Sequence, residues 1–281
     1  MKIVGLTLAR NEAWILRTTL DASLRWCDEI IVMNHSSTDA TRAIAATAAN
    51  ETKRVKIIDW TDGEHWMEMD ARQRSLEIGR EHHATHIAIV DADEALTHNN
   101  LPVVRSWFET LKPGECLDVP MIAPWGSLDS YSASTSGVIT LGFADASDLY
   151  WKPRGEEKYH YHARAPQGSG NHVRSTCEGG VFHLQYSSMK RLIWKHRHYM
   201  MSERIRWPKY LIEDINEKYH WWEKPPHGQT LMPVSEDWWG DYPRDWIRLD
   251  HEPWYAQECQ RMIDKYGSER FEGLDLFGWT P

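Results

Sequence analysis

A short apolar run that ends in three acidic residues constrains the fold of this chain most. Residues 86–94 read His-Ile-Ala-Ile-Val-Asp-Ala-Asp-Glu, and Ile87–Val90 is typical of a buried strand in the centre of a parallel sheet. Asp91, Asp93 and Glu94 follow at the carboxyl end of that strand, where ligands bind in open α/β sheets. Two carboxylates in this arrangement can hold a divalent cation that in turn holds a diphosphate. The alternative is a solvated loop at a strand end.

The rest of the N-terminal half alternates between strand and helix patterns. Strands are expected at residues 3–8, 29–33, 55–59, 86–90, 117–122 and 137–143, and helices at 11–24, 41–49 and 67–80. This alternation predicts an α/β fold with a mostly parallel central sheet and flanking helices. Polar clusters follow three of the strands, at 9–12, 34–38 and 91–94. Because the carboxyl ends of parallel strands meet at one edge of a sheet, these clusters predict a site there.

Composition narrows the class of protein. The 281 residues suffice for one large domain or for one domain with an appendage, and 41% hydrophobic with 26% charged residues is ordinary for a soluble protein. No run approaches the length of a membrane span, and the first residues do not resemble a signal peptide. The four cysteines are scattered, which favours a reducing compartment, and we expect a cytoplasmic protein. The net charge of −9 argues against broad non-specific binding to nucleic acid.

Glycine loops that bind phosphate are absent. The first expected strand is followed by Ala9-Arg10-Asn11-Glu12 rather than by Gly-x-Gly-x-x-Gly, and no Gly-x-x-x-x-Gly-Lys loop occurs. A phosphate group would therefore be held by a metal ion and by side chains.

Four short motifs carry a resemblance to a known family. In order they are Ala9-Arg10-Asn11-Glu12, Ser37-Thr38-Asp39-Ala40-Thr41, Ala71-Arg72-Gln73-Arg74 and Asp91-Ala92-Asp93-Glu94. Their order and spacing are similar to those of family 2 glycosyltransferases of GT-A fold. The resemblance implies a nucleotide-sugar donor, above all a UDP-sugar, and a divalent metal, Mn²⁺ or Mg²⁺.

The resemblance also implies roles for individual residues. Asp91 would contact the ribose or the metal, and Asp93 would be a metal ligand. The nucleotide pocket would be lined by Arg10, Glu12, Asn34, His35 and Arg72. Four residues have a plainer alternative: Arg10 and Arg72 as surface charges, Glu12 as a first-turn helix residue favoured by the macrodipole, and Asp39 of the second motif as a helix cap.

The chain departs from the family pattern at Asn34 and His35. The family usually has Asp at the first position and often an acidic or small residue at the second. A carboxylate at the first position accepts a hydrogen bond from the uracil imide N–H. The amide oxygen of Asn34 can also accept, so the sequence leaves the identity of the base open.

Later segments supply candidates for catalysis. By resemblance, His183 would complete the metal site or contact the diphosphate, although a histidine beside an apolar run is often structural. Inverting transfer needs a general base for the acceptor hydroxyl, and Glu178 and Asp148 lie at suitable sequence distances from the acidic triplet. The alternative for both is an exposed loop carboxylate, and retaining chemistry, which needs no such base, stays open.

The C-terminal part has a different composition. Nine of the 16 tryptophans lie from Trp194 onward, and residues 190–210 carry seven Lys or Arg against one acid, Glu203. This segment predicts a helix, and its cations have three readings: a solvated face, neutralisation of a diphosphate or anionic acceptor, or contact with nucleic acid. We expect a catalytic domain over residues 1–188 and a Trp-rich, largely helical extension over residues 189–281.

The sequence thus predicts a metal-dependent glycosyltransferase. It would move a sugar from a nucleotide-sugar donor to an acceptor hydroxyl of a small molecule, a glycan or a lipid-linked compound. One alternative is a phage-type enzyme that glycosylates hydroxymethylated pyrimidines in DNA, with the target base flipped into an aromatic pocket. Another is a nucleotide-sugar-binding module without turnover.

Overall fold

The computed structural model describes residues 1–61, 68–151, 163–220 and 230–280. The chain forms two compact units. The first comprises Met1–Ile122, Ser136–Leu184 and Val234–Arg248, and the second comprises Ala123–Thr135, Gln185–Pro233 and Leu249–Pro281. Both units are discontinuous in sequence, whereas the sequence predicts a single boundary after residue 188.

A large sheet forms the centre of the first unit. Its strands are β1 (Ile3–Ala9), β2 (Glu29–His35), β3 (Val55–Trp60), β4 (His86–Ile89), β5 (Glu94–Leu96), β6 (Cys116–Ile122), β8 (Gly137–Ala144), β9 (His172–Arg174) and β10 (Val181–His183). The strand order is β3-β2-β1-β4-β8-β6-β10-β5, and β9 pairs with β6. Strands β3, β2, β1 and β4 run parallel, while β8 is antiparallel to both of its neighbours. The predicted α/β class with a mostly parallel sheet is confirmed.

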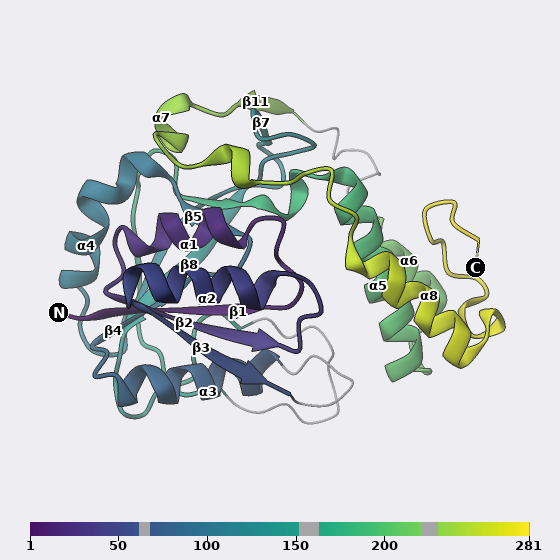
Figure 1. Cartoon of the computed structure of the whole chain (residues 1–281), viewed down its shortest axis with the longest axis horizontal. Coiled ribbons are helices and arrows are strands. Elements are labelled where there is room, and N and C mark those ends of the chain that lie inside the picture. Colours follow the sequence, from purple (N-terminus) through teal and green to yellow (C-terminus); the bar gives the residue numbers. More distant parts are fainter. Residues whose placement is uncertain (62–67, 152–162, 221–229, 281) are drawn as a thin grey trace. The chain divides into compact units, whose positions relative to one another are not determined.

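Helices cover both faces of this sheet. They are α1 (Leu16–Leu24), α2 (Thr41–Thr52), α3 (Glu68–Glu81) and α4 (Leu101–Glu109), and α7 (Glu236–Trp239) also belongs to this unit. Side chains of β1 and β2 alternate between the two faces: Ile30 and Val32 pack with α1, α2 and α4, whereas Ile31 and Met33 pack with α3. Figure 1 shows α1 and α2 running side by side over the sheet. The result is a three-layer α/β/α arrangement.

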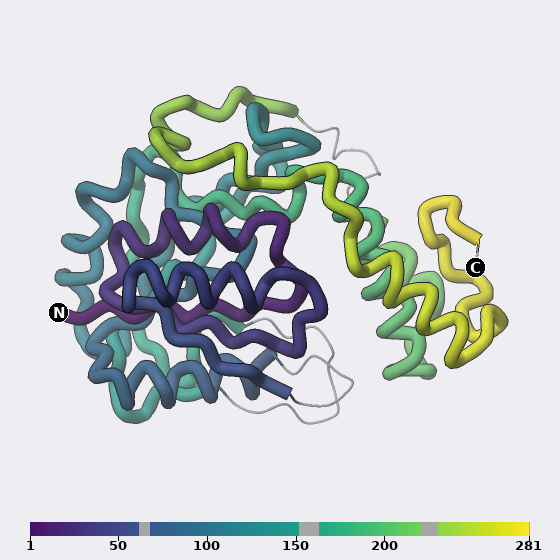
Figure 2. The backbone as a smooth tube through the Cα atoms, in the orientation of Figure 1, coloured from purple at the N-terminus to yellow at the C-terminus, as the bar shows by residue number. Residues whose placement is uncertain are grey.

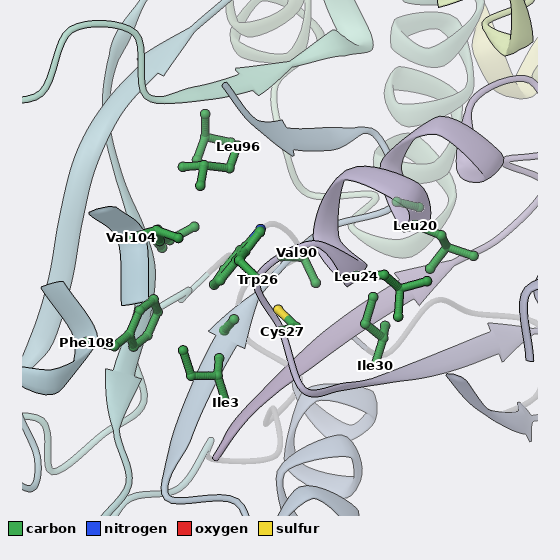
Figure 3. Close-up of a cluster of buried hydrophobic side chains, with 14 of the residues drawn as sticks. Ile3, Leu20, Leu24, Trp26, Cys27, Ile30, Val90, Leu96, Val104 and Phe108 are labelled. Atoms are coloured by element: carbon green, nitrogen blue, oxygen red, sulfur yellow. The ribbon is translucent and has the colours of Figure 1, made fainter. Parts of the chain in front are cut away.

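The larger of the two clusters of buried apolar side chains packs around the end of the strand that leads to the acidic triplet. Figure 3 shows Leu20 and Leu24 of α1 and Phe108 of α4 around Trp26 and Val90. Val90, directly before the acidic triplet, is buried, and its N–H donates to Leu6 O of β1 at 3.1 Å. The acidic triplet therefore begins from an immobilised strand in the middle of the sheet.

The second unit is mainly helical. It contains α5 (Met189–Arg206), α6 (Ile212–Tyr219) and α8 (Trp254–Tyr266), together with the two-stranded sheet of β7 (Ser130–Ser132) and β11 (Leu231–Pro233). Helices α5 and α8 lie side by side, visible as green and yellow tubes in Figure 2. Their shared core includes Met200, Cys259 and Phe271. Among the described residues no helix has both the length and the apolar character needed to cross a membrane.

Candidate active site

The polar clusters predicted from the sequence meet at the carboxyl ends of β1, β2 and β4. The register pairs Ala9 with Asn34 and Leu6 with Ile89, so the loops after these strands start at the same edge of the sheet. Asn11 joins two of the loops, because its Oδ1 accepts from Thr38 N at 2.7 Å and from Asp39 N at 3.2 Å. The site edge is thus built by hydrogen bonds between successive motifs.

Asp39 has a structural role in this arrangement. Its carboxylate accepts from Thr41 N at 2.9 Å and from Ala13 N at 3.1 Å. The first bond occupies the N–H of the first residue of α2, and the second ties that end of the helix to the loop after β1. The N-cap itself is Ala40, so Asp39 supports the start of α2 from one residue before the cap position.

Arg10 and Glu12 occupy the loop after β1, and His35 ends β2. Arg10 Nη1 lies 3.4 Å from His35 Nδ1, so these two candidates for the nucleotide pocket are neighbours. Glu12 accepts from the indole Nε1 of Trp14 at 2.6 Å, and its backbone N–H donates to Thr41 Oγ1 at 2.7 Å. Glu12 is therefore held by one contact to the turn before α1 and one contact to the first residue of α2.

Asn34 is paired with a carboxylate from the neighbouring strand. Its Nδ2 donates to Asp59 Oδ1 at 2.8 Å, and Asp59 also accepts a two-pronged contact from Arg42. Hydrogen bonds from Arg42 and then Asn34 lower the pKa of Asp59. Asn34 is buried, and its Oδ1 has no hydrogen-bond partner among the described residues. A buried acceptor of this kind calls for a donor from a ligand or from water.

Asp91, the first acid of the triplet, lies between two arginines. Arg72 Nη2 contacts Asp91 Oδ1 at 3.0 Å and Oδ2 at 3.1 Å, and Arg164 Nη1 donates to Oδ2 at 2.8 Å. Arg72 is itself buried and donates through Nε to Glu68 at 2.9 Å. The surface-charge alternative for Arg72 does not describe this geometry.

All three guanidinium nitrogens of Arg164 donate hydrogen bonds. Its Nε donates to Thr140 O at 2.9 Å, and its Nη2 donates to Ile89 O at 3.0 Å. Both terminal nitrogens form a fork with Glu94, each at 2.9 Å. Burial raises the pKa of Glu94, repulsion from Asp91 and Asp93 adds to the rise, and Arg164 opposes it.

Asp93 and His183 lie next to each other. Strand β10 pairs with β5 so that His183 stands opposite Glu94, and Leu184 N donates to Asp93 O at 2.8 Å. His183 Nε2 lies 3.9 Å from Asp93 Oδ1. Together with Asp91, these are the residues that the sequence analysis assigned to the metal.

The donor set suits a metal that is only partly held by protein. No group of three or more His, Cys, Asp or Glu side chains among the described residues is arranged to hold a metal ion. Asp91 is engaged by arginines, which leaves Asp93 and His183 as the pair in position. Magnesium-type sites use one or two carboxylates and take the other ligands from phosphates and water, so the residues fit a metal bound together with a diphosphate.

The two candidates for the general base are not brought to this pair. Strand β8 runs antiparallel to β4, so its end, Ala144, lies beside His86 at the start of β4. Asp148 follows that end and is exposed at the edge opposite the acidic triplet. Glu178 is exposed, and its backbone O accepts from Asn99 and Asn100, beyond the far end of β5 from Glu94.

A comparison with protein-family models decides the identity of the chain at the level of family. The model described as glycosyl transferase family 2 matches residues 6–172. This match covers more than half of the 281 residues and includes all four motifs. The chain belongs to glycosyl transferase family 2. The family predicted from the motifs is therefore confirmed, and the fold is of the GT-A type.

Solved structures provide distant similarities. The mannosyltransferase PcManGT from Pyrobaculum calidifontis, in complex with GDP-Man and Mn²⁺, is 20% identical with a TM-score of 0.33, over 42% of this chain and 34% of that one. Glucosyl-3-phosphoglycerate synthase from Mycobacterium tuberculosis, in complex with Mn²⁺, UDP and glucosyl-3-phosphoglycerate, is 19% identical with a TM-score of 0.33, over 44% and 45%. S. aureus TarS is 13% identical with a TM-score of 0.47, over 96% and 55%.

These comparisons are partial in length. The chain spans less than half of the mannosyltransferase and of the synthase that it matches. No curated protein sequence matches the chain significantly.

Arg164 and Asp59 contact candidate site residues of this family 2 chain, and the sequence analysis did not single them out. Arg164 stands in a turn-rich stretch with many other Arg and His residues, and nothing in the sequence distinguishes it from them. Three of those residues, Arg154, His160 and His162, lie outside the described residues. Asp59 was identifiable in principle, since it ends a parallel strand next to β2.

Proposed function

We propose that this family 2 chain transfers a sugar from a nucleotide-sugar donor to an acceptor hydroxyl, with Mn²⁺ or Mg²⁺ as cofactor. One observation carries the proposal. Four motifs converge on one sheet edge, where the Arg72–Asp91 ion pair lies beside the Asp93–His183 pair. In this proposal the positive groups interact with the diphosphate and the negative groups interact with its metal.

The donor is a UDP-sugar in this proposal. The buried Oδ1 of Asn34 accepts an N–H group of the base, as an imide N–H of uracil would offer. Asp59 holds the amide in the required orientation through Nδ2. Arg10, Glu12 and His35 line the same edge, and Asp91 is the group for the ribose.

The metal is held by Asp93 and His183 together with the donor diphosphate. When bound, it stabilises the negative charge of the departing diphosphate. The protein itself supplies a buried cation, Arg72, whose Nη1 has no hydrogen-bond partner among the described residues. That N–H is a further donor for a ligand oxygen, because a buried guanidinium group gains from full pairing.

Glu178 and Asp148 remain proposals for the general base of an inverting transfer. Both residues lie away from the Asp93–His183 pair, whereas a general base must reach the acceptor hydroxyl. The test is to compare the rate of sugar transfer by Glu178→Gln and Asp148→Asn with the wild-type rate. A large loss in one variant, with unchanged donor affinity, identifies the base, and wild-type rates in both eliminate both.

The acceptor is a small molecule, a glycan or a lipid-linked compound in this proposal. The alternative acceptor, hydroxymethylated DNA, was suggested by the cations of the segment 190–210. Within the second unit, Arg197 donates to Leu276 O at 2.8 Å and Phe277 O at 3.0 Å, Lys195 donates to Gln185, and Lys190 pairs with Glu252. These cations are thus engaged within the helical unit, and no observation on the described residues favours the DNA acceptor.

The deciding experiment is nucleotide release from a panel of nucleotide sugars, with hydroxymethylated duplex DNA included among the acceptors. Metal-dependent release of UDP with transfer to a hydroxyl acceptor supports the proposal. Binding of nucleotide and metal without any turnover on the whole panel would instead identify a nucleotide-sugar-binding module.

A further inference from the structure

We propose that Arg164 is a built-in cation that keeps a divalent metal from binding at the acidic triplet until the nucleoside diphosphate is present. This inference rests on the proposed function, since it concerns the same metal and the same donor. It assigns an electrostatic role to a residue that lies outside the four family motifs.

The first observation is where Arg164 lies. It is 15% exposed and contacts two acids of the triplet at once, Asp91 at 2.8 Å and Glu94 at 2.9 Å. A divalent cation shared by the acids of the triplet would have to approach this same guanidinium group. Because the group is nearly buried, water screens the repulsion between the two cations poorly.

The second observation is that Arg164 cannot easily swing away. Every N–H of its guanidinium group donates, to Thr140 O, Ile89 O, Asp91 or Glu94. These partners lie on or directly after three strands of the sheet, so displacement of Arg164 would leave several buried acceptors unpaired. The cation is therefore a fixed part of the site.

The third observation concerns what remains for the metal. Asp91 is held between Arg72 and Arg164. The protein ligands in this proposal are therefore Asp93 and the neighbouring His183. Two protein ligands beside two cations give weak binding. A diphosphate adds oxygen ligands and negative charge, which offset the repulsion from both arginines. Metal and nucleotide should therefore bind with strong positive coupling.

A purely structural role for Arg164 predicts something different. A residue that only joined strands would, when changed, lower stability and would leave the ratio of metal affinities with and without nucleotide as it was. A built-in cation predicts that neutralisation of the charge raises metal affinity in the absence of nucleotide. The ratio of affinities thus separates the two roles.

The experiment measures free Mn²⁺ by electron paramagnetic resonance during titration of the full chain, with and without UDP or GDP. The wild type should bind Mn²⁺ at least about tenfold more tightly with nucleotide, a coupling within the usual range for linked sites. Arg164→Gln keeps hydrogen-bond donors but removes the charge, and should raise Mn²⁺ affinity without nucleotide about tenfold. Arg164→Lys keeps the charge and should retain the wild-type coupling.

Controls keep the outcomes apart. Arg174→Gln removes a charge from the exposed strand β9 and should change neither affinity. Equal Mn²⁺ affinity with and without nucleotide in the wild type overturns the inference. This outcome needs no variant, so the inference can be tested even if Arg164→Gln does not fold. An unchanged affinity ratio in folded Arg164→Gln overturns it as well. Failure of UDP and GDP to bind under any condition would instead contradict the proposed function.

Discussion

At the scale of single residues, the site depends on charges that are buried in pairs. Arg72 is almost fully buried and joins Asp91 to Glu68, whereas Arg74, two positions later on the same helix, pairs with Glu77 at the surface. The same residue type therefore has a different energetic weight at the two positions. Removal of one member of a buried pair leaves an uncompensated charge, while an exposed pair contributes little.

Arg72→Met should lower the free energy of unfolding by about 3–5 kcal/mol, because Glu68 would lose its counter-ion in a buried place and Asp91 would keep only Arg164. Urea denaturation monitored by circular dichroism measures this. Arg74→Met is the matched control and should cost about 1 kcal/mol or less. Equal losses in the two variants would contradict the picture of a buried ion pair at the site.

The sequence predicted the candidate residues that stand in motifs, but not the residues that contact them. Asp91, Asp93 and Arg72 were identifiable because each stands in a short motif at a strand end or helix start. Arg164 and Asp59 reach the same edge through pairing of strands that are distant in sequence. A single sequence does not reveal which arginine of a turn-rich stretch will lie against a given carboxylate.

At the scale of elements, the junction between parallel and antiparallel strands places the site. Strand β8 lies against β4, and Gly142 has no room for a side chain: a Cβ there would come within 2.2 Å of Ile87 O and 2.8 Å of the Phe108 ring. No side chain larger than hydrogen fits between the strands. The strand that leads into the acidic triplet therefore depends on this glycine.

Gly142→Ala should lower the free energy of unfolding by about 3 kcal/mol, since either the backbone of β4 or the Phe108 ring must move. Gly137→Ala, on the same strand with open space around its Cα, is the control and should change stability by about 0.5 kcal/mol or less. Thermal unfolding followed by calorimetry compares them. A tolerated alanine at Gly142 would contradict the described strand contact.

Helix α5 carries a histidine whose protonation opposes folding. Burial lowers the pKa of His196 to about 4, Lys195 adds to this, and the bond to Tyr219 O opposes it. Because the unfolded chain takes up this proton near its ordinary pKa of about 6.5, stability is full above that pH and falls as the pH drops towards 4. The loss from this group should reach roughly 3 kcal/mol.

Urea denaturation of wild type and His196→Gln between pH 7 and pH 4.5 tests this. The variant should show a shallower loss of stability on acidification than the wild type. Parallel curves for wild type and His196→Gln would show that His196 is not the group responsible.

Elements of the parallel half were predictable from the sequence to within a few residues. The expected strand at 29–33 corresponds to β2 at Glu29–His35, and the expected helix at 67–80 corresponds to α3 at Glu68–Glu81. Apolar periodicity and capping residues determine such elements locally. The short strands β5, β9 and β10 were not predicted as strands, because a strand of three residues has no pattern of its own and exists through its neighbours.

At the scale of the whole molecule, one chain combines an α/β unit that carries the family motifs with a helical unit rich in aromatic residues. Within the second unit, the α5 cations Arg197 and Lys190 are engaged by Leu276 O and Glu252. The predicted domain boundary at residue 188 stays a prediction. The four free cysteines leave both units without disulfide constraints.

The central claim is that Asp93 holds a metal with the donor diphosphate, and the most direct test is nucleotide release. Wild type and Asp93→Asn are incubated with UDP-sugars, an acceptor panel and Mn²⁺, with and without EDTA. The account predicts UDP release by the wild type that EDTA abolishes and that falls at least about a hundredfold in Asp93→Asn, as loss of a group that stabilises the transition state would give. Release that persists in EDTA, or at the wild-type rate in Asp93→Asn, would contradict it.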